Sequence, residues 1–368
     1  MIWLHGASLG DLNALTPMGA RLQREGYALL VSAVTESGRA RARSIFPEAP
    51  LVRPPLLSSW RARRLIHRWA PRLLLLERLE LWPRWLSASA REGLPVVVLN
   101  GRVGERTLQI RSLLRAGSSR LALFCAQSGE DAARALQLGV PEDKIYATGD
   151  SKYDQILQRC AEPPSAELRG VLGSLQLVIG CLHRDEEAPA LRALAPFLRA
   201  RSGLRVLIAP RYMSRIPALQ RRLSRLGVSS VRRSENKPLG AQGGVCLLDS
   251  YGELASVYQL APVALIGGTF GRRGGQNILE PARWGVPVIF GPGAPSPERA
   301  ALADTGGLLA TDWEQAFTAA FERPLSAPPS LQVLRRRLCG AFERQWAALI
   351  AAGLLPSHPP PGSVPRRP

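Results

Sequence analysis

The sequence predicts an α/β protein built from two doubly wound domains that face a cleft. Two observations favour this fold class. Short, nearly continuous apolar runs alternate with amphipathic stretches along most of the 368 residues, as expected for parallel sheets covered by helices on both faces. The series occurs twice, with a loose Pro-containing segment from Arg159 to Ser165 between the halves. The length suffices for two domains, and a hydrophobic content of 46% suffices for their cores.

The first half contains a series of strand candidates separated by helical stretches. Strands are expected at Met1–His5, Ala28–Val34, Arg72–Glu77, Pro95–Asn100, Leu121–Ala126 and Lys144–Thr148. Apolar residues at helical spacing predict helices between them, for example over Asp11–Glu25 and Glu130–Leu138. These elements define a first domain over residues 1–158, followed by a linker over 159–172.

The second half repeats the scheme. Strands are expected at Leu175–Cys181, Arg205–Ala209, Val228–Arg232, Val245–Leu248, Val263–Ile266 and Val286–Phe290. They define a second domain over residues 173–325, followed by one amphipathic helix within 326–352, about Leu331 to Ala351. The tail over residues 353–368 is rich in proline and is expected to be disordered.

The composition excludes several classes of protein. No run approaches the length of a membrane-spanning helix, and Met1 leads directly into an apolar strand, which leaves no room for a signal peptide. The five cysteines are odd in number and far apart, and the four histidines are equally dispersed. Neither a disulfide framework nor a metal site is predicted, and no cofactor is expected.

The chain is strongly basic, with a net charge of +19 and a pI of about 11.1. One interpretation is a genomic bias toward arginine codons, because charge alone fixes no partner. The other is attraction to an anionic membrane surface or an anionic substrate. Nucleic acid is not expected, because aromatic residues make up only 6% and no basic stripe is interleaved with them.

Three polar residues follow strands of the first half. Asp11, in HGASLGD, sits near a helix start, where it either takes a proton or merely caps the helix. Glu80 follows a buried strand and precedes Trp82-Pro83; it is either a cleft carboxylate or a solvated one. Lys152, in TGDSKYD, either stabilises developing negative charge or lies on the surface.

The second half places a glycine loop and a short helix between two strands, in RRGGQNILEPARWGVPVIFGP from Arg272 to Pro292. Bare N–H groups and the positive end of a helix dipole favour an anion, so a phosphate site is predicted. Arg211 directly follows a strand and can bind a phosphate through two hydrogen bonds. Asn277 can bond a base or a ribose, and Glu280 can accept from ribose hydroxyls.

Taken in order, these stretches resemble the 3-deoxy-D-manno-octulosonic acid (Kdo) transferases of lipopolysaccharide assembly, over most of the chain to about Pro292. The motifs that carry the resemblance are Ser8-Leu9-Gly10-Asp11, Glu80 to Pro83, Asn100 with Arg102, Glu105 and Arg106, Ala126 to Ser128, Gly149 to Asp154, Pro210 to Tyr212, Tyr251 to Leu254, and Gly274 to Pro281. Each motif is short, but their number and order are specific to the family.

The resemblance implies two Rossmann-like domains of the glycosyltransferase B fold. It implies transfer of Kdo from a CMP-Kdo donor to a lipid A precursor acceptor, with inversion and without a metal. The family's base falls on Asp11, and Glu80 and Lys152 would help to stabilise the transition state. Donor-binding positions carried over are Pro210, Arg211, Tyr251, Gly252, Glu253, Gly275, Asn277, Ile278, Leu279 and Glu280.

Several positions depart from the family pattern. Asp11 replaces a glutamate, Tyr212 and Gln276 replace histidines, and Tyr251 replaces a methionine. The N-terminal membrane helix usual in the family is not expected, so peripheral docking at the cytoplasmic face of the bacterial inner membrane is predicted, through arginines unless an upstream start adds a helix. Two alternatives remain: a related transferase with another nucleotide sugar or acceptor, and a catalytically silent paralogue that binds anionic lipid.

Overall fold

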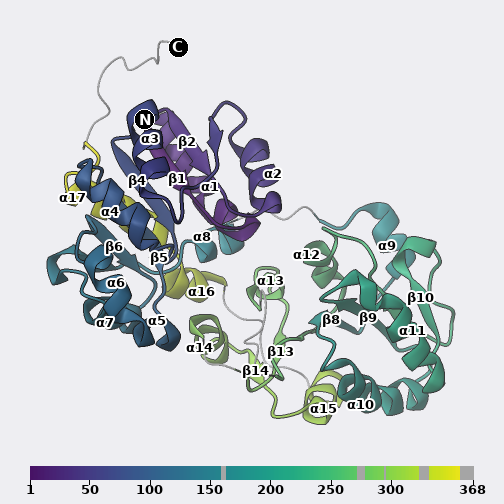
Figure 1. Cartoon of the computed structure of the whole chain (residues 1–368). Helices are drawn as coiled ribbons and strands as arrows, with labels where there is room; N and C mark the ends of the chain where they lie inside the picture. The colour runs from purple at the N-terminus through teal and green to yellow at the C-terminus, as the bar shows by residue number, and fades with distance from the viewer. Residues whose placement is uncertain (159–162, 272–277, 294–295, 323–330, 357–368) are drawn as a thin grey trace. The chain divides into compact units, whose positions relative to one another are not determined.

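The computed structural model describes residues 1–158, 163–271, 278–293, 296–322 and 331–356. The chain divides into two compact units, each with its own sheet. The first unit contains Met1–Gln155 and Cys339–Pro368, and the second contains Ile156–Leu338. After the second unit, the described residues 339–356 return to the first unit (Figure 1).

The first unit has a seven-stranded parallel sheet in the order β3-β2-β1-β4-β5-β6-β7. Its strands are β1 (Ile2–His5), β2 (Leu29–Ser32), β3 (Leu51–Val52), β4 (Leu73–Glu77), β5 (Val96–Gly101), β6 (Leu123–Ala126) and β7 (Ile145–Ala147). Its helices are α1 (Leu9–Arg24), α2 (Glu36–Ile45), α3 (Ser59–Trp69), α4 (Pro83–Arg91), α5 (Glu105–Gln109), α6 (Arg111–Ser118), α7 (Gly129–Gln137), the 3₁₀ turn η1 (Glu142–Lys144), α8 (Lys152–Gln158), which runs past the unit boundary, and α17 (Ala341–Ala351).

The second unit has another seven-stranded parallel sheet, in the order β10-β11-β9-β8-β12-β13-β14. Its strands are β8 (Leu177–Leu182), β9 (Arg205–Pro210), β10 (Ser230–Arg232), β11 (Gly244–Leu247), β12 (Ala264–Ile266), β13 (Val288–Phe290) and β14 (Leu308–Leu309). Its helices are α9 (Ala166–Leu172), α10 (Glu187–Ala200), η2 (Met213–Arg215), α11 (Ile216–Arg225), η3 (Arg233–Glu235), α12 (Leu254–Val257), η4 (Tyr258–Leu260), α13 (Leu279–Ala282), α14 (Pro297–Ala303), α15 (Trp313–Glu322) and α16 (Leu331–Leu338).

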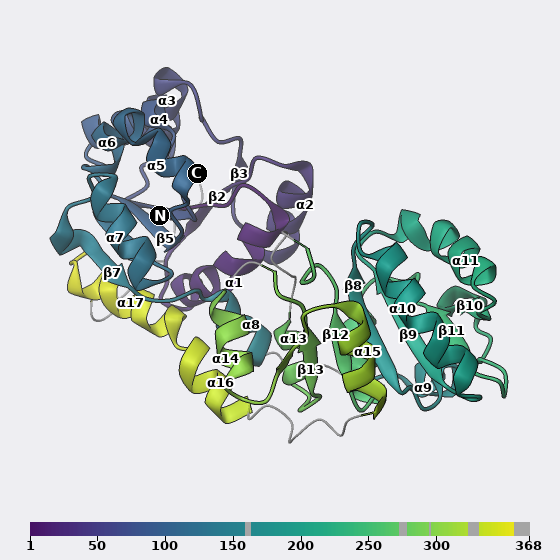
Figure 2. The same ribbon diagram turned by 90° about the horizontal axis from the view of Figure 1, so that it is seen from below.

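Helices cover both faces of the first sheet and build two cores. On one face α1, α2 and α17 pack on the sheet, with Leu12, Leu15 and Trp346 among the buried side chains. On the other face α3, α4, α6 and α7 pack, with Trp85 at the centre. In the second unit α10, α11 and α15 cover one face, and Figure 2 shows α10 beside α15. Because helices cover the first sheet on both faces, its strands are continuous apolar runs.

The fold class predicted from the sequence is confirmed, and every predicted strand is present. The strands that the sequence did not indicate, β3 and β14, have two residues each and lie at sheet edges. Such short pairings have no room for a periodic pattern. The linker expected over residues 159–172 also contains α9, which the Ser165 side chain caps by accepting from the Leu168 N–H at 3.1 Å.

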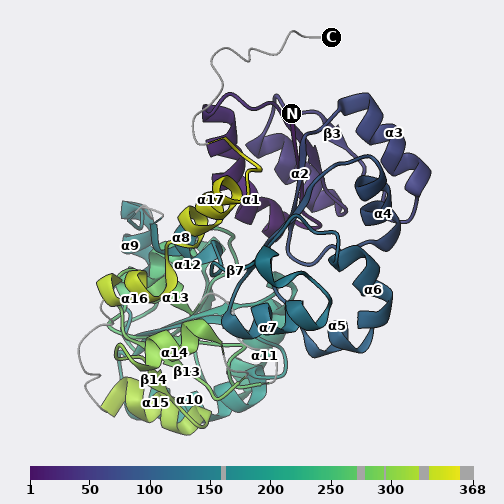
Figure 3. The same ribbon diagram turned by 90° about the vertical axis from the view of Figure 1, so that its left-hand side faces the viewer.

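The single C-terminal helix expected over Leu331–Ala351 is wrong. The structure has α16 and α17, separated at Gly340, whose φ of 89° lies in the left-handed region that favours glycine. The carboxylate of Asp154 accepts hydrogen bonds from the backbone N–H groups of Gly340 and Phe342 and so caps α17. Figure 3 shows α17 beside α1, and Arg21 of α1 donates to Glu343 of α17 at 2.8 Å.

Candidate active site

Each sheet has a point where the strand order changes direction, and polar side chains gather there. In the first sheet it lies between β1 and β4, and in the second between β8 and β12. Loops that leave the carboxyl ends of such neighbouring strands run to opposite faces and leave a crevice for a ligand. Asp11 follows β1, Arg78 follows β4, and Glu186 follows β8.

Asp11 lies in the first turn of α1 and is held from two sides. Its Oδ2 atom accepts from the backbone N–H and from the hydroxyl of Ser8, both at 2.8 Å. Its Oδ1 atom lies 3.4 Å from Nε of Arg78, and the side chain is 13% exposed. The capping role is therefore present, as the sequence allowed. It occupies one carboxylate oxygen and leaves the other beside a guanidinium.

Arg78 is a residue that sequence reasoning missed. It directly follows β4, and its φ of 61° is uncommon for a residue other than glycine. Its backbone N–H donates to Leu99 of β5 at 2.8 Å, which fixes this turn against the sheet. The turn brings the side chain beside Asp11. A strained turn after a strand carries no signature in the sequence, so no pattern could have selected Arg78.

Glu80 is held by two neighbours of different kinds. Its Oε2 accepts from the indole N–H of Trp82 at 2.7 Å, and Nε2 of His5 lies 4.0 Å away. His5 is fully buried, with its ring edge against Trp85 at a centroid distance of 5.0 Å. Burial lowers the pKa of His5 to about 4, so the ring is neutral at neutral pH. His5 is a second residue that the sequence did not single out.

Lys152 begins α8 and is paired with an acid from the preceding turn. Its ammonium lies 3.4 Å from Oδ2 of Asp150, and its backbone N–H donates to Oδ1 of the same residue at 3.0 Å. Gln127 also donates to Asp150, at 3.0 Å. The ammonium further lies over the Tyr153 ring, 4.7 Å from its centroid. Lys152 is thus more constrained than a typical surface lysine.

A buried network supports the turn that carries Lys152. Glu77, at the end of β4, accepts two hydrogen bonds of 3.0 Å from the amide of Asn100. The same Asn100 exchanges hydrogen bonds with Ser151 and accepts from Gln345 of α17 at 2.7 Å. Burial raises the pKa of Glu77 well above its usual range, although the Asn100 amide opposes this. The network joins β4, β5, the turn before α8, and α17.

In the second unit the Glu186 carboxylate fixes the loop after β12. It accepts from the backbone N–H groups of His183 at 3.1 Å, Gly268 at 2.6 Å and Phe270 at 3.1 Å. Glu186 is 4% exposed, so these hydrogen bonds replace its solvation. The carboxylate thereby ties the two loops on either side of the second switch point.

The charges of Arg211 and Glu280 both act on the buried thiol of Cys181. Burial raises the pKa of the Cys181 thiol to about 11, the charge of Glu280 adds to the rise, and that of Arg211 opposes it. Cys181 has a φ of 55° at an irregularity between β8 and β9, and Arg211 itself is exposed after the buried Pro210. The two side chains singled out for the phosphate and the ribose therefore both influence the same buried group, with opposite sign.

The remaining predicted donor residues differ in how accessible they are. Tyr251 is 85% exposed, and Gly252 beside it has a φ of 90°. Glu253 accepts from Arg233 at 3.1 Å. Ile278 and Leu279 are buried, at 5% and 1% exposure, so only their backbone can face a ligand. The helix expected after the glycine loop is α13, with four residues, and Gly275 and Asn277 lie outside the described residues.

Two further findings concern the residues that the structure describes. The described residues contain no group of three or more His, Cys, Asp or Glu side chains placed to hold a metal ion. They also contain no helix that is both long enough and apolar enough to span a bilayer.

The two parallel sheets, each with polar groups at its switch point, have the architecture of the glycosyltransferase B fold. The fold is similar to that of a glycosyltransferase from Rickettsia africae ESF-5, with a TM-score of 0.64 and 13% identity over 97% of this chain and 99% of that one. It is also similar to the UDP-GlcNAc 2-epimerase from Neisseria meningitidis, with a TM-score of 0.63 and 12% identity over 95% and 99%.

The sequence matches identify the family more narrowly. The family model described as 3-deoxy-D-manno-octulosonic-acid transferase (kdotransferase) matches residues 1–155. The 3-deoxy-D-manno-octulosonic acid transferase of Bordetella pertussis is 30% identical over 94% of this chain and 83% of its own length. That of Chlamydophila psittaci (strain ATCC VR-125 / 6BC) is 31% identical over 79% and 69%. The chain belongs to the Kdo transferase family.

Proposed function

We propose that this chain transfers Kdo from CMP-Kdo to a sugar hydroxyl of a lipid A precursor, with inversion, at the cytoplasmic face of the inner membrane. The observation that carries the proposal is the Asp11 carboxylate at the first switch point. One of its oxygens is fixed by Ser8 and the other lies beside Arg78. Membership of the Kdo transferase family supports the donor and the acceptor.

In the proposed reaction the acceptor hydroxyl oxygen attacks C2 of Kdo. The bond from C2 to the phosphate oxygen breaks, and CMP leaves with the bonding electrons. The hydroxyl proton passes to Oδ1 of Asp11, since Oδ2 accepts two hydrogen bonds from Ser8. No step requires a metal ion.

Two cations of the first unit assist in this scheme. Arg78 orients the base, because its guanidinium lies beside Oδ1. Lys152, held by Asp150, stabilises negative charge that develops in the transition state. Glu80, fixed by Trp82, orients the reacting groups.

In the second unit the donor nucleotide is assigned to the groups around Cys181 and the adjoining loops. Arg211 pairs with the phosphate and Glu280 accepts from the ribose. The assignment is supported by the position of Arg211 after β9 and of Glu280 in the segment that follows β12, the two strands that flank β8, and by the effect of both charges on the Cys181 thiol. The backbone of Tyr251 and Gly252 completes this set, together with Gly275 and Asn277 as predicted from the sequence.

The experiment is a transfer assay with CMP-Kdo generated in place and a tetraacylated lipid A precursor. We expect Asp11→Ala to abolish transfer and Asp11→Glu to keep or raise it, because a glutamate restores the side-chain length usual in the family. Each variant is checked for folding by thermal unfolding. If the unaltered chain and both variants are folded and none of them transfers Kdo, this donor–acceptor pair is excluded.

A second candidate is a transferase with another nucleotide sugar, and exposed tyrosines near the donor residues favour it. Tyr212 is 53% exposed and Tyr251 is 85% exposed, at positions where the family pattern has other side chains. Stabilisation against heat by CMP, UMP and UDP separates the candidates, because a bound ligand raises the stability of the folded state by mass action. Stabilisation by CMP alone supports Kdo transfer, and stabilisation by none supports a silent paralogue.

A further inference from the structure

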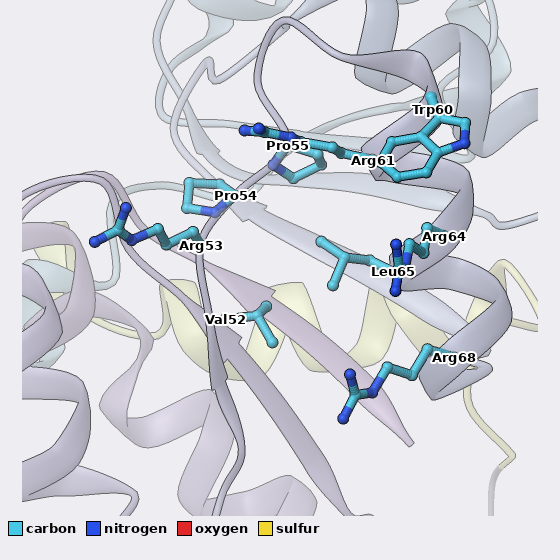
Figure 4. Close-up of a pocket in the computed structure, with 9 residues that line it drawn as sticks. All are labelled: Val52, Arg53, Pro54, Pro55, Trp60, Arg61, Arg64, Leu65 and Arg68. Carbon is cyan, nitrogen blue, oxygen red and sulfur yellow. The ribbon is translucent and has the colours of Figure 1, made fainter.

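A basic pocket lies in the first unit between the edge strand β3 and helix α3. Its volume is about 400 Å³, and Figure 4 shows the side chains that line it. Val52, Arg53, Pro54 and Pro55 come from the end of β3 and the loop after it, and Trp60, Arg61, Arg64, Leu65 and Arg68 come from one face of α3. We call it the β3–α3 pocket. It is separate from the Asp11 site, with which it shares no residue.

The lining of the pocket is positive and contains no acid. Arg61, Arg64 and Arg68 extend from α3 on the side of Leu65, and the Arg53 side chain extends outward from the loop after β3 (Figure 4). Among the described residues, none of the four arginines has a carboxylate within 4.0 Å, whereas Arg63 on the same helix pairs with Glu92 at 2.6 Å. Guanidinium groups that line a pocket without a carboxylate partner attract an anion with several oxygens, such as a phosphate.

Two large apolar side chains, one that lines the pocket and one just before α3, are exposed to solvent. Trp60 is 65% exposed, and Leu57, in the loop before α3, is 69% exposed. The Arg64 guanidinium lies 5.4 Å from the Trp60 ring centroid. A tryptophan and a leucine beside arginines on an amphipathic helix suit the boundary between headgroups and acyl chains. A water-soluble phosphate compound would leave both apolar side chains exposed.

We propose that the β3–α3 pocket binds the headgroup phosphate of an anionic phospholipid and docks the first unit on a membrane surface. The arginines hold the phosphate, and Trp60 with Leu57 enters the interface. The loop after β3 leaves the carboxyl edge of the sheet, the edge that also carries Asp11 after β1, because the strands are parallel. Docking there places the bilayer on the side where a lipid-linked acceptor would have to reach Asp11.

The test is flotation of the full chain with phosphatidylcholine vesicles, with and without phosphatidylglycerol. We expect binding only to the anionic vesicles and expect Arg64→Gln with Arg68→Gln to weaken it about 25-fold, about fivefold for each guanidinium removed. Trp60→Ala, which leaves the charge unchanged, is expected to weaken binding several-fold. These side chains are exposed, so thermal unfolding should be unaffected.

The matched control is Arg221→Gln with Arg225→Gln on α11, which removes the same charge from exposed positions of the second unit. Equal weakening in the control would overturn the proposal, because net charge alone would then explain binding. Unchanged binding in the Arg64/Arg68 variant, or no vesicle binding by the unaltered chain, would overturn it too. Calorimetry with inorganic phosphate completes the test: tight binding of the free ion without vesicle binding would identify a soluble phosphate site instead. Transfer to a detergent-dispersed acceptor is expected to survive in the variant, so this test is independent of the proposed activity.

Discussion

Two Ser-Xaa-Xaa-Asp turns begin helices at the same edge of the first sheet, and they use their carboxylates differently. Ser8 and Asp11 begin α1 after β1, and Ser128 and Asp131 begin α7 after β6. In the second turn Ser128 donates to Oδ2 of Asp131 at 2.7 Å, and the Val103 backbone N–H donates to Oδ1 at 2.8 Å. Both oxygens of Asp131 are therefore committed to holding the fold.

In the first turn only one oxygen is committed in this way. Oδ2 of Asp11 accepts two hydrogen bonds from Ser8, and Oδ1 has the Arg78 guanidinium at 3.4 Å. The difference follows from topology, since β1 borders the strand-order reversal and β6 does not. One local motif thus gives a structural acid at one strand and a candidate base at another.

The largest effect is expected from exchanging each acid for its amide. Asp11→Asn should lower transfer at least about a hundredfold, because a general base contributes about 10²- to 10⁴-fold. Asp131→Asn should leave the rate near that of the unaltered chain. It should instead lower the stability by about 1–3 kcal/mol, because the hydrogen bonds that Val103 and Ser128 donate to a charged carboxylate are replaced by weaker bonds with a neutral amide. Rates under saturating substrates and urea unfolding of both variants measure the two effects. A comparable rate loss in both would remove the distinction between the turns.

The Ser-Xaa-Xaa-Asp motif could be recognised in the sequence, but the sequence did not show that one of its aspartates is structural and the other a candidate base. The spacing of Ser8 and Asp11 allowed a cap or a base, and the structure shows that the cap uses Oδ2 while Oδ1 faces a charge from another strand. Arg78 reaches that position through a left-handed backbone conformation, which no pattern in the sequence predicts. Asn100 and Gln345 are hydrogen-bonded across the chain from β5 to the C-terminal helix, so their pairing depends on where that helix packs.

The next largest effect is a dependence of the free energy of unfolding on pH, and it comes from His5. His5 stands three positions before Ser8 in the first turn, where the second turn has Cys125 three positions before Ser128. Burial lowers the pKa of His5 from 6.5 to about 4, so the unfolded chain takes up this proton first as the pH falls. The contribution of His5 to stability is complete above pH 6.5 and is lost between pH 6.5 and 4, by about 3 kcal/mol at most.

Urea unfolding between pH 7 and pH 4 tests this loss. His5→Gln should flatten the dependence, because it removes the buried ring whose pKa is lowered. An NMR titration of His5 itself gives its pKa directly and does not require the variant to fold. A midpoint near 6.5 would show that the ring is open to solvent and would remove the reason for treating it as a neutral neighbour of Glu80.

The smallest effect is expected from removing the two serine hydroxyls, and it separates capping from positioning. Ser8→Ala and Ser128→Ala should each lower the free energy of unfolding by about 1 kcal/mol, the usual cost of losing such a residue at a helix start. Ser8→Ala should also lower the turnover rate a few-fold, because Asp11 keeps the Ser8 backbone N–H and Arg78 but loses one hydrogen bond that fixes its carboxylate. Ser128→Ala should leave the turnover rate unchanged. A few-fold loss seen only as a higher KM in Ser8→Ala would mean that Ser8 contacts the acceptor rather than orienting the base. An equal loss of turnover in both variants would mean that helix fraying, and not the orientation of Asp11, limits the reaction.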